Sequence, residues 1–312
     1  MNTLSIVLIG LLTGLHAATW GGFKDSPFEG FRPASFARSI ALGLLAALAL
    51  AFFTDLENGQ PALLVIVGVC YAAERLATEW WKSIAREDDQ TAYSIPMRLA
   101  VHGRPIDDRR QRYGLGLAII AGLLVLCWAI RDLQSMLPNV PVWVTVLLAG
   151  TGGWLTAVGG AWKDAPVEGF SGWKFLRSPV VATGWAAVLS PFTHDWVLLA
   201  VAAGGWSVIS IETYKTFLTG GRPPGKFAEK PVRFDVREVR EACRVVHVGL
   251  YGVLAAGLGA GLLPGSPLGS VAWRLDHVVV VVAVSLMAAG AGLLVLVQDR
   301  ERLETEVLEL VR

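Results

Sequence analysis

Charge is scarce in this chain. Only 17% of its 312 residues are charged, whereas 54% are hydrophobic and the mean hydropathy is +0.52. Soluble domains carry enough charged residues to cover their surface, and this chain does not. The composition therefore excludes a soluble globular protein and predicts an all-α integral membrane protein.

Cysteine pairs and clustered histidines are lacking too. Cys70, Cys127 and Cys243 lie in or beside apolar segments without CxxC spacing, so neither a disulfide framework nor a zinc site is expected. The five histidines are dispersed and form no i, i+4 pair that could start a metal site. We interpret the cysteines as packing residues.

Carboxylates are nearly absent from the apolar segments, where His16 is the clearest ionisable residue. Ionisable groups deep in a bilayer usually mark ion or proton pathways, so their scarcity argues against a transporter with a coupling-ion site at the midplane. The loops 82–113 and 215–245 are basic but mixed with acids, and we expect no nucleic-acid partner. The stretch GGRPPGK at 220–226 lacks the P-loop pattern and is expected to be a turn.

What the chain does contain is an internal repeat. The stretch WGGFKDSPFEGFRPASFARS at 20–39 is matched by GGAWKDAPVEGFSGWKFLRS at 159–178, with ten identities at one constant offset. Two further charged residues recur with the same three-residue spacing, Glu79 and Lys82 as Glu212 and Lys215. Self-similarity of this kind decides the architecture before any local feature does. It predicts two copies of one unit, each carrying the motif KDxPxEGF.

Nine apolar segments are long enough to cross roughly 30 Å of hydrocarbon, at about 20 residues each. They lie at approximately 3–21, 37–54, 61–79, 114–131, 141–162, 178–192, 196–214, 245–263 and 277–297. Four segments per unit return the chain to its starting side, so we expect parallel repeats related by a pseudo-two-fold axis along the membrane normal. The expected organisation is a first four-helix repeat at 1–135, a second at 136–263, a peripheral ninth transmembrane helix at 264–297 and a cytosolic amphipathic tail at 298–312.

Basic residues set the expected orientation. The loops after the first, third, fifth and seventh segments, together with the C-terminal tail, hold 24 of the 27 lysines and arginines. Cytoplasmic loops carry such an excess. We therefore predict a multi-pass protein of the cytoplasmic (inner) membrane, with the N-terminus outside and the C-terminus cytoplasmic. Both motifs then lie on the cytosolic side.

The acidic residues of the motif suit phosphate chemistry. Pro27 and Gly30 predict a tight turn that leaves the first segment and projects Asp25 and Glu29 from a constrained backbone. With Glu79 they offer oxygen donors, which Mg²⁺ prefers when it bridges a protein to a phosphate. The expected magnesium ligands are Asp25, Glu29, Asp164 and Glu168. The expected catalytic bases or further ligands are Glu79 and Glu212.

Positive side chains accompany the acids in both units. Arginine holds phosphate oxygens by bidentate contact, and lysine holds them as a point charge. The expected phosphate-binding residues are Lys24, Arg38, Lys82, Arg98, Lys163, Arg177, Lys215 and Arg233. In an alternative interpretation the charges only neutralise one another while proline and glycine shape a hairpin, since surface ion pairs contribute about 0–1 kcal/mol.

The predicted layout resembles that of the intramembrane prenyltransferases, which also join two four-helix units and a ninth helix. In that family, paired acidic motifs at the cytosolic mouth hold Mg²⁺ and a diphosphate. The chain lacks the N-D-x-x-D signature of the family, and its motif follows the first segment of each unit rather than the second. The resemblance is therefore one of architecture.

These observations predict a protein that binds a phosphate-bearing lipid or isoprenoid at its cytosolic face, with Mg²⁺, and transfers or cleaves its head group. Two alternatives stay open: a transporter or lipid flippase that uses the motifs as a cytosolic gate, and a non-catalytic scaffold. In a scaffold, we expect the motif carboxylates to be engaged by the protein's own lysines and arginines, with no cavity between them. Membrane lipids are the expected partners, and a homo-oligomer is left open.

Overall fold

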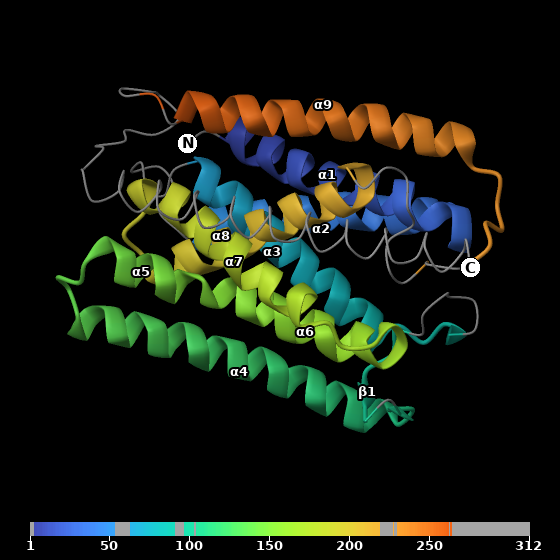
Figure 1. Ribbon diagram of the computed structural model, residues 1–312, viewed down its shortest axis with the longest axis horizontal. Helices are drawn as coiled ribbons and strands as arrows, with labels where there is room; N and C mark the ends of the chain where they lie inside the picture. Colours follow the sequence, from blue (N-terminus) through green and yellow to red (C-terminus); the bar gives the residue numbers. More distant parts are fainter. Residues whose placement is uncertain are drawn as a thin grey trace, which may run out of the picture.

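The structure is a computed structural model, and it describes most of the chain before residue 264 (Figure 1). The described residues are 3–53, 63–90, 97–102, 104–218, 227, 230–261 and 263. Most of them belong to helices that run along the long axis of the molecule. The predicted ninth helix at 264–297 and the tail at 298–312 lie outside the described residues.

The secondary structure of the described part is helical apart from one small hairpin. Its α-helices are α1 (Thr3–Glu29), α2 (Pro33–Phe53), α3 (Leu63–Trp80), α4 (Arg109–Met136), α5 (Val142–Ala149), α6 (Thr151–Glu168), α7 (Gly172–Leu189), α8 (Trp196–Thr213) and α9 (Arg237–Gly261). Its short helical turns are the π-helical η2 (Trp81–Ala85) and η5 (Tyr214–Leu218), and the 3₁₀ turn η4 (Ser190–Phe192). The antiparallel hairpin consists of β1 (Ala100–Val101) and β2 (Arg104–Pro105), with Ala100 opposite Pro105.

Six helical segments of the described part are long and apolar enough to cross a membrane. They are Leu4–Glu29, Pro33–Phe52, Arg109–Met136, Val142–Pro166, Trp196–Phe217 and Arg237–Ala260. In lipid, only α-helices and closed β-barrels satisfy the hydrogen bonds of the backbone, and these six segments are α-helical. The prediction of an all-α, multi-pass membrane protein is confirmed.

Local sequence sets where the helices begin and end. Asp108, Ser171 and Asp195 are the N-caps of α4, α7 and α8, and each side chain accepts a hydrogen bond from a backbone N–H in the first turn. The ends of α1 and α6 are each followed by a glycine with positive φ, 76° at Gly30 and 78° at Gly169. Glycine adopts this conformation without steric cost. The next helix therefore begins just after each of these glycines.

The expected tight turn at Pro27 is wrong. α1 continues through Pro27 to Glu29, and α6 likewise continues through Pro166 to Glu168. A proline removes one backbone hydrogen bond from a helix. In α1 the residues 26–28 are buried, so the packing of this last turn offsets that loss. The motif residues therefore project from helices, and glycine rather than proline ends the helix.

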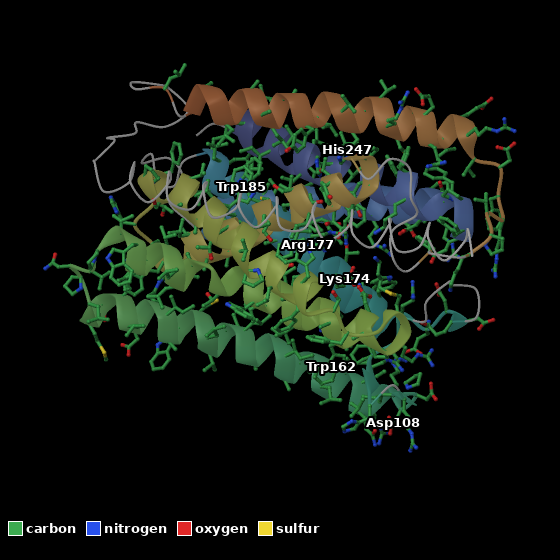
Figure 2. The ribbon with its side chains drawn as sticks, viewed as in Figure 1. Asp108, Trp162, Lys174, Arg177, Trp185 and His247 are labelled. Atoms are coloured by element: carbon green, nitrogen blue, oxygen red, sulfur yellow. The ribbon has the colours of Figure 1, made fainter. Side chains whose placement is uncertain are left out.

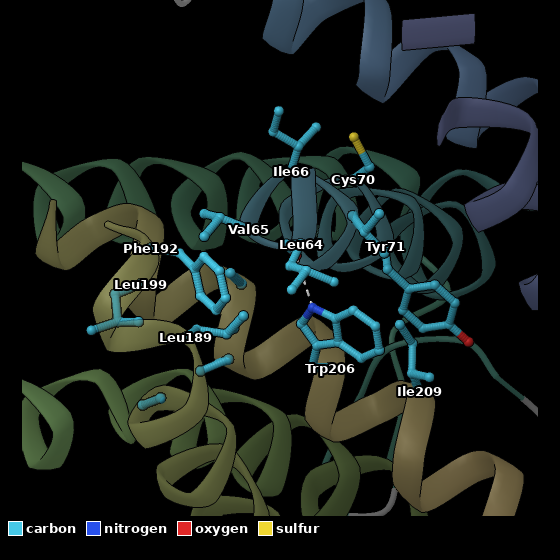
Figure 3. Packing of buried hydrophobic residues seen from close by; sticks show 14 of the residues in the cluster. Leu64, Val65, Ile66, Cys70, Tyr71, Leu189, Phe192, Leu199, Trp206 and Ile209 are labelled. Atoms are coloured by element: carbon cyan, nitrogen blue, oxygen red, sulfur yellow. Dashed lines mark hydrogen bonds between the residues drawn. The ribbon is translucent and has the colours of Figure 1, made fainter. Parts of the chain in front are cut away.

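The core is centred on the crossing of α3 and α8 (Figure 3). Backbone meets backbone there: a Cβ on Gly205 would overlap the carbonyl oxygen of Gly68, and a Cβ on Gly68 would lie 2.5 Å from that of Ala202. Small residues permit such an approach between membrane helices. The Trp206 indole N–H also donates to the Leu64 carbonyl across the crossing, at 2.9 Å. The two helices are consequently fixed to each other at this point.

The helices form two groups that meet mainly through this crossing. In the first group α1, α2, α3 and α9 pack together, and in the second group α5, α6, α7 and α8 pack together with α4 against α8. The fourth long helix of each half of the chain thus packs in the other group. α4, from the first half, lies on the side of α5 and α6, and α9, from the second half, lies beside α1 (Figure 1). Smaller contacts between the groups join α1 to η5 and α4 to η2.

Candidate functional site at the motif end

The two motifs lie at one end of the bundle, here called the motif end. α1 and α6 end there, and α3 and α8 continue there into η2 and η5. Both π-helical turns begin just after the glutamate that the sequence singled out, Glu79 in α3 and Glu212 in α8. Single π turns inside helices are uncommon and are frequently found at functional sites. This shared irregularity was not predicted from the sequence.

At the motif end, Glu212 lies between two lysines. Its carboxylate is 2.7 Å from the Nζ atom of Lys215, three residues along the chain, and 3.6 Å from the Nζ atom of Lys24 on α1. Residues three apart on a helix are neighbours, so the first pair is local. The second pair joins the two groups of helices.

Glu79 has the same arrangement in the other group. Its carboxylate is 3.3 Å from the Nζ atom of Lys82 and 3.2 Å from the Nζ atom of Lys163 on α6. Each motif lysine therefore pairs with the glutamate of the other half of the chain. The lysine–glutamate cluster is defined as Lys24, Lys82, Lys163, Lys215, Glu79 and Glu212.

The motif aspartates lie next to this cluster. Asp25 Oδ1 is 3.8 Å from the Nζ atom of Lys24, and Asp164 Oδ1 is 3.8 Å from that of Lys163. The side chains are partly buried, with an exposed fraction of 10% for Lys24 and 40% for Asp164. Burial lowers the pKa of Lys82, because it disfavours the ammonium form, and the nearby Glu79 carboxylate opposes this shift.

A tryptophan connects the cluster to the interior. The Nζ atom of Lys24 lies 4.0 Å from the ring centroid of Trp20, and the Arg75 guanidinium lies 5.2 Å from it. Cations over the face of an indole are attracted by its quadrupole. The Trp20 indole N–H donates to the Tyr71 hydroxyl at 2.7 Å, and Arg75 donates to both carboxylate oxygens of Glu74. The sequence analysis did not single out Trp20, although its position one helical turn before Lys24 was a signal for this contact.

The remaining predicted phosphate-binding residues are less central. Arg98 donates to Asp107 at 2.7 Å, next to the β1–β2 hairpin. Arg177 on α7 (Figure 2) lies within electrostatic reach of Glu212, and Arg38 on α2 is half-buried. The structure thus brings four of the eight predicted residues, the lysines, directly onto the two glutamates.

The predicted magnesium ligands form no recognisable metal centre in the described part of the chain. Within the described residues no group of three or more His, Cys, Asp or Glu side chains is placed to hold a metal ion. Asp25 and Asp164 each lie beside a lysine, and Glu29 is half-buried at the end of α1. The side chain of Glu168 lies outside the described residues. Magnesium at this site stays a prediction.

A pocket of about 370 Å³ adjoins the first motif. It is lined by Pro27, Val232, Arg233, Phe234, Asp235, Val236, Arg237 and Arg240. The backbone N–H groups of Arg233 and Phe234 donate to the Pro27 carbonyl, at 2.9 and 3.1 Å. The motif therefore fixes the position of the segment that carries the arginines.

Positive charge exceeds negative charge in this arginine pocket. Arg237 donates to both oxygens of Asp235 at 3.1 Å, and these hydrogen bonds lower the pKa of that carboxyl. The Arg240 guanidinium lies 4.3 Å from the ring centroid of Phe23. The sequence predicted a role for Arg233 but missed Arg237 and Arg240, whose three-residue spacing at the start of α9 was the available signal.

A second polar site lies in the middle of the bundle. The ring centroids of His16 and His247 are 4.1 Å apart, and both ring nitrogens of His16 are buried without a hydrogen-bond partner among the described residues. Thr19 and Thr213 lie within hydrogen-bonding distance of the two ring nitrogens of His247, at 3.0 and 3.3 Å. The sequence singled out His16 but not this pairing, because His247 lies far along the chain.

The helices and the charged cluster define a multi-pass membrane protein with paired charges gathered at one end of its bundle. Comparison of the chain with models of known protein families, with curated proteins and with solved structures finds no match. The function therefore has to follow from the chemistry of the site itself.

Proposed function

We propose that the protein binds the phosphate group of a lipid or isoprenoid at the cytosolic face of the inner membrane. The observation that carries the proposal is the arginine pocket, where Arg233, Arg237 and Arg240 accompany one carboxylate, Asp235. The guanidinium fork matches the oxygens of a phosphate and holds them by charge-assisted hydrogen bonds. The surplus of positive charge favours an anion of this kind.

The rim of the arginine pocket favours a lipid over a free anion. Val232 and Phe234 expose 67% and 45% of their surface beside the arginines. Apolar side chains next to basic ones are typical of the level of lipid head groups, where one part of the surface meets acyl chains and the other meets phosphate. Pro27 on the pocket wall lies one turn after Lys24, so α1 connects the pocket to the lysine–glutamate cluster.

The proposal includes the repeated architecture. Three correspondences in the described residues support two parallel four-helix units: glycine with positive φ after α1 and α6, π-helical turns after α3 and α8, and exchanged packing of α4 and α9. The peripheral ninth helix belongs to the same proposal, and it lies outside the described residues. Head-group or prenyl transfer with Mg²⁺ belongs to the same proposal. Glu79 and Glu212 would serve as bases or as further metal ligands in this proposal.

One observation favours the scaffold alternative. Asp25 and Asp164 lie beside the lysines of their own motifs, as a purely structural pairing predicts. The arginine pocket distinguishes the two functions, since it adjoins the first motif and has two carboxylates too few to neutralise its three arginines.

The lipid proposal predicts that the protein retains a phosphorylated lipid through detergent purification. Replacing three arginines together, as Arg233→Gln, Arg237→Gln and Arg240→Gln, is expected to lower this retention about tenfold or more, because each charge-assisted hydrogen bond contributes about 1.5–3 kcal/mol. Native mass spectrometry measures the lipid-bound fraction. Adding EDTA tests the magnesium prediction: a loss of lipid supports a bridging metal, and unchanged retention speaks against one.

Arg244→Gln is the matched control for the triple variant. Arg244 lies on the same helix one turn beyond Arg240, outside the pocket, and pairs with Glu241 at 2.6 Å. Its replacement is expected to leave lipid retention unchanged. Equal retention by the wild type and the triple variant would contradict a phosphate site at the arginine pocket.

The orientation predicts which end of α4 faces the cell exterior. In a background with the three native cysteines replaced by serine, Asn139→Cys beyond the end of α4 is expected to react with a membrane-impermeant maleimide on intact cells. Arg104→Cys in β2, at the motif end, is expected to react only after permeabilisation, because basic loops stay in the cytoplasm. Both positions are exposed in the structure. The reverse labelling pattern would place the motifs outside.

A further inference from the structure

We propose that Lys24–Glu212 and Lys163–Glu79 form a latch, which closes the two groups of helices against each other at the motif end and opens as part of the protein's cycle. The inference goes beyond lipid binding and is independent of it. It assigns to the bundle the two arrangements, closed and open, that a carrier of a membrane-bound substrate requires.

The latch is reciprocal. Lys24 belongs to the first group and reaches Glu212 of the second at 3.6 Å, while Lys163 belongs to the second group and reaches Glu79 of the first at 3.2 Å. Each group thus contributes one cation and one anion. Opening the latch changes the net charge of neither group, so no long-range repulsion builds up between them.

Every charge in the latch has a second partner on its own group. Glu212 keeps Lys215 at 2.7 Å, and Glu79 keeps Lys82 at 3.3 Å. The two motif lysines keep their neighbouring aspartates, Asp25 and Asp164, at 3.8 Å. Breaking a buried ion pair is costly chiefly because it leaves a charge unpaired. Here the open state retains a local partner for each of the four charged side chains, so the closed and open arrangements can be close in free energy.

The packing supplies a pivot away from the latch. The two groups meet mainly where α3 crosses α8, and the backbones touch at Gly68 and Gly205. Gly68 lies three turns before Glu79 on α3, a distance of about 16 Å along the helix axis. Between the groups, the motif end adds the rings of Phe23 and Phe217 at 4.8 Å and the hydrogen bond from Arg112 of α4 to the Ile84 carbonyl of η2 at 2.8 Å. A rotation about the glycine crossing that leaves α4 attached to η2 would separate the latch while the core stays packed.

A distance measurement across the motif end tests the latch. Spin labels are placed by Trp81→Cys in η2 and Tyr214→Cys in η5, in a background with the native cysteines replaced by serine. These residues follow Glu79 and Glu212 at the same spacing, and each exposes more than 40% of its surface. Double electron–electron resonance then reports the distribution of distances between the two labels in reconstituted protein.

Removing the two anions of the latch is expected to open it. In the variant Glu79→Gln with Glu212→Gln, the distribution should gain a population longer by about 5 Å or more, the scale of a one-turn displacement between packed elements. Glu241→Gln is the matched control, because it removes an exposed ion pair within α9, 2.6 Å from Arg244, and leaves the latch intact. Its distribution should match that of the wild type.

A charge swap separates electrostatics from a general loss of packing. The swapped protein carries four replacements, Lys24→Glu, Glu212→Lys, Lys163→Glu and Glu79→Lys. Each pair across the two groups of helices again joins opposite charges, so the groups attract each other. Each new charge also lies beside a local residue of the same sign, which removes the local partner of the open state, so the short distance should return. Two outcomes would overturn the latch. Either the Glu79→Gln, Glu212→Gln variant shows the same single distance as the wild type, or the swapped protein keeps the long distance. Neither outcome bears on lipid retention at the arginine pocket, so the two proposals fail separately.

Discussion

Gly205→Ala will lower the free energy of unfolding by about 3 kcal/mol or more, because its single methyl group has no space at the crossing of α3 and α8. The added Cβ would overlap the Gly68 carbonyl oxygen and lie 2.8 Å from the carbonyl carbon and 3.2 Å from the Ala72 nitrogen. All three are backbone atoms, so no side chain can rotate away. The loss is measured by thermal unfolding of the purified protein in detergent, with the reactivity of the buried Cys70 as the signal of unfolding.

The control for this substitution is Gly249→Ala in α9. A Cβ at Gly249 meets nothing within 4 Å, and alanine is the better helix former by about 1 kcal/mol. We expect its stability to equal or slightly exceed that of the wild type. If Gly205→Ala and Gly249→Ala unfold at the same temperature, the close approach of α3 and α8 is wrong, and with it the pivot of the latch.

Arg112→Met is expected to have the second largest effect on stability. The Arg112 side chain is fully buried, donates to the carbonyl oxygens of Ile84 and Ile106 and pairs with Glu87. Methionine fills a similar volume but donates no hydrogen bond, so the carbonyls lose their donor and Glu87 keeps only Arg109, at 4.0 Å. A buried carbonyl left without its donor costs about 1–3 kcal/mol, and the loss at Glu87 adds little because 49% of that side chain is exposed. Thermal unfolding and limited proteolysis between residues 86 and 108 measure the change.

Arg110→Met provides the matched comparison. Arg110 lies two residues earlier on α4 and is exposed, so the same substitution there removes a charge without burying an unpaired group. We expect its unfolding temperature and its cleavage pattern to stay within experimental error of the wild type. Equal cleavage of the Arg110→Met and Arg112→Met proteins would show that Arg112 does not hold the loop after η2.

The sequence was sufficient for properties that each segment carries by itself. Hydropathy predicted an all-α membrane protein because span length and apolar composition are local quantities. The duplicated motif directed attention to Lys24, Lys163, Glu79 and Glu212, and the structure gathers these four side chains at one end of the bundle. Their types and their repetition were visible in the chain itself.

The pairing of these residues depends on long-range packing, which no local pattern encodes. The sequence places each motif lysine next to an aspartate of its own motif, whereas in the structure Lys24 also reaches Glu212 and Lys163 also reaches Glu79. That exchange follows from the crossing of α3 and α8. The turn expected at Pro27 failed for a related reason, since the burial of residues 26–28 outweighs one lost hydrogen bond.

The exchanged packing of α4 and α9 bears on how the chain assembles in the bilayer. α1 leaves the ribosome well before α9, yet α9, the last helix described, packs along one face of α1. Until α9 is made, the face of α1 that meets it has only lipid or the insertion machinery as a neighbour. A chain halted after α4 likewise holds that helix without α8, against which it packs. Although the sequence reads as two copies of one unit, neither copy closes on itself, so assembly is complete only when both halves have been inserted.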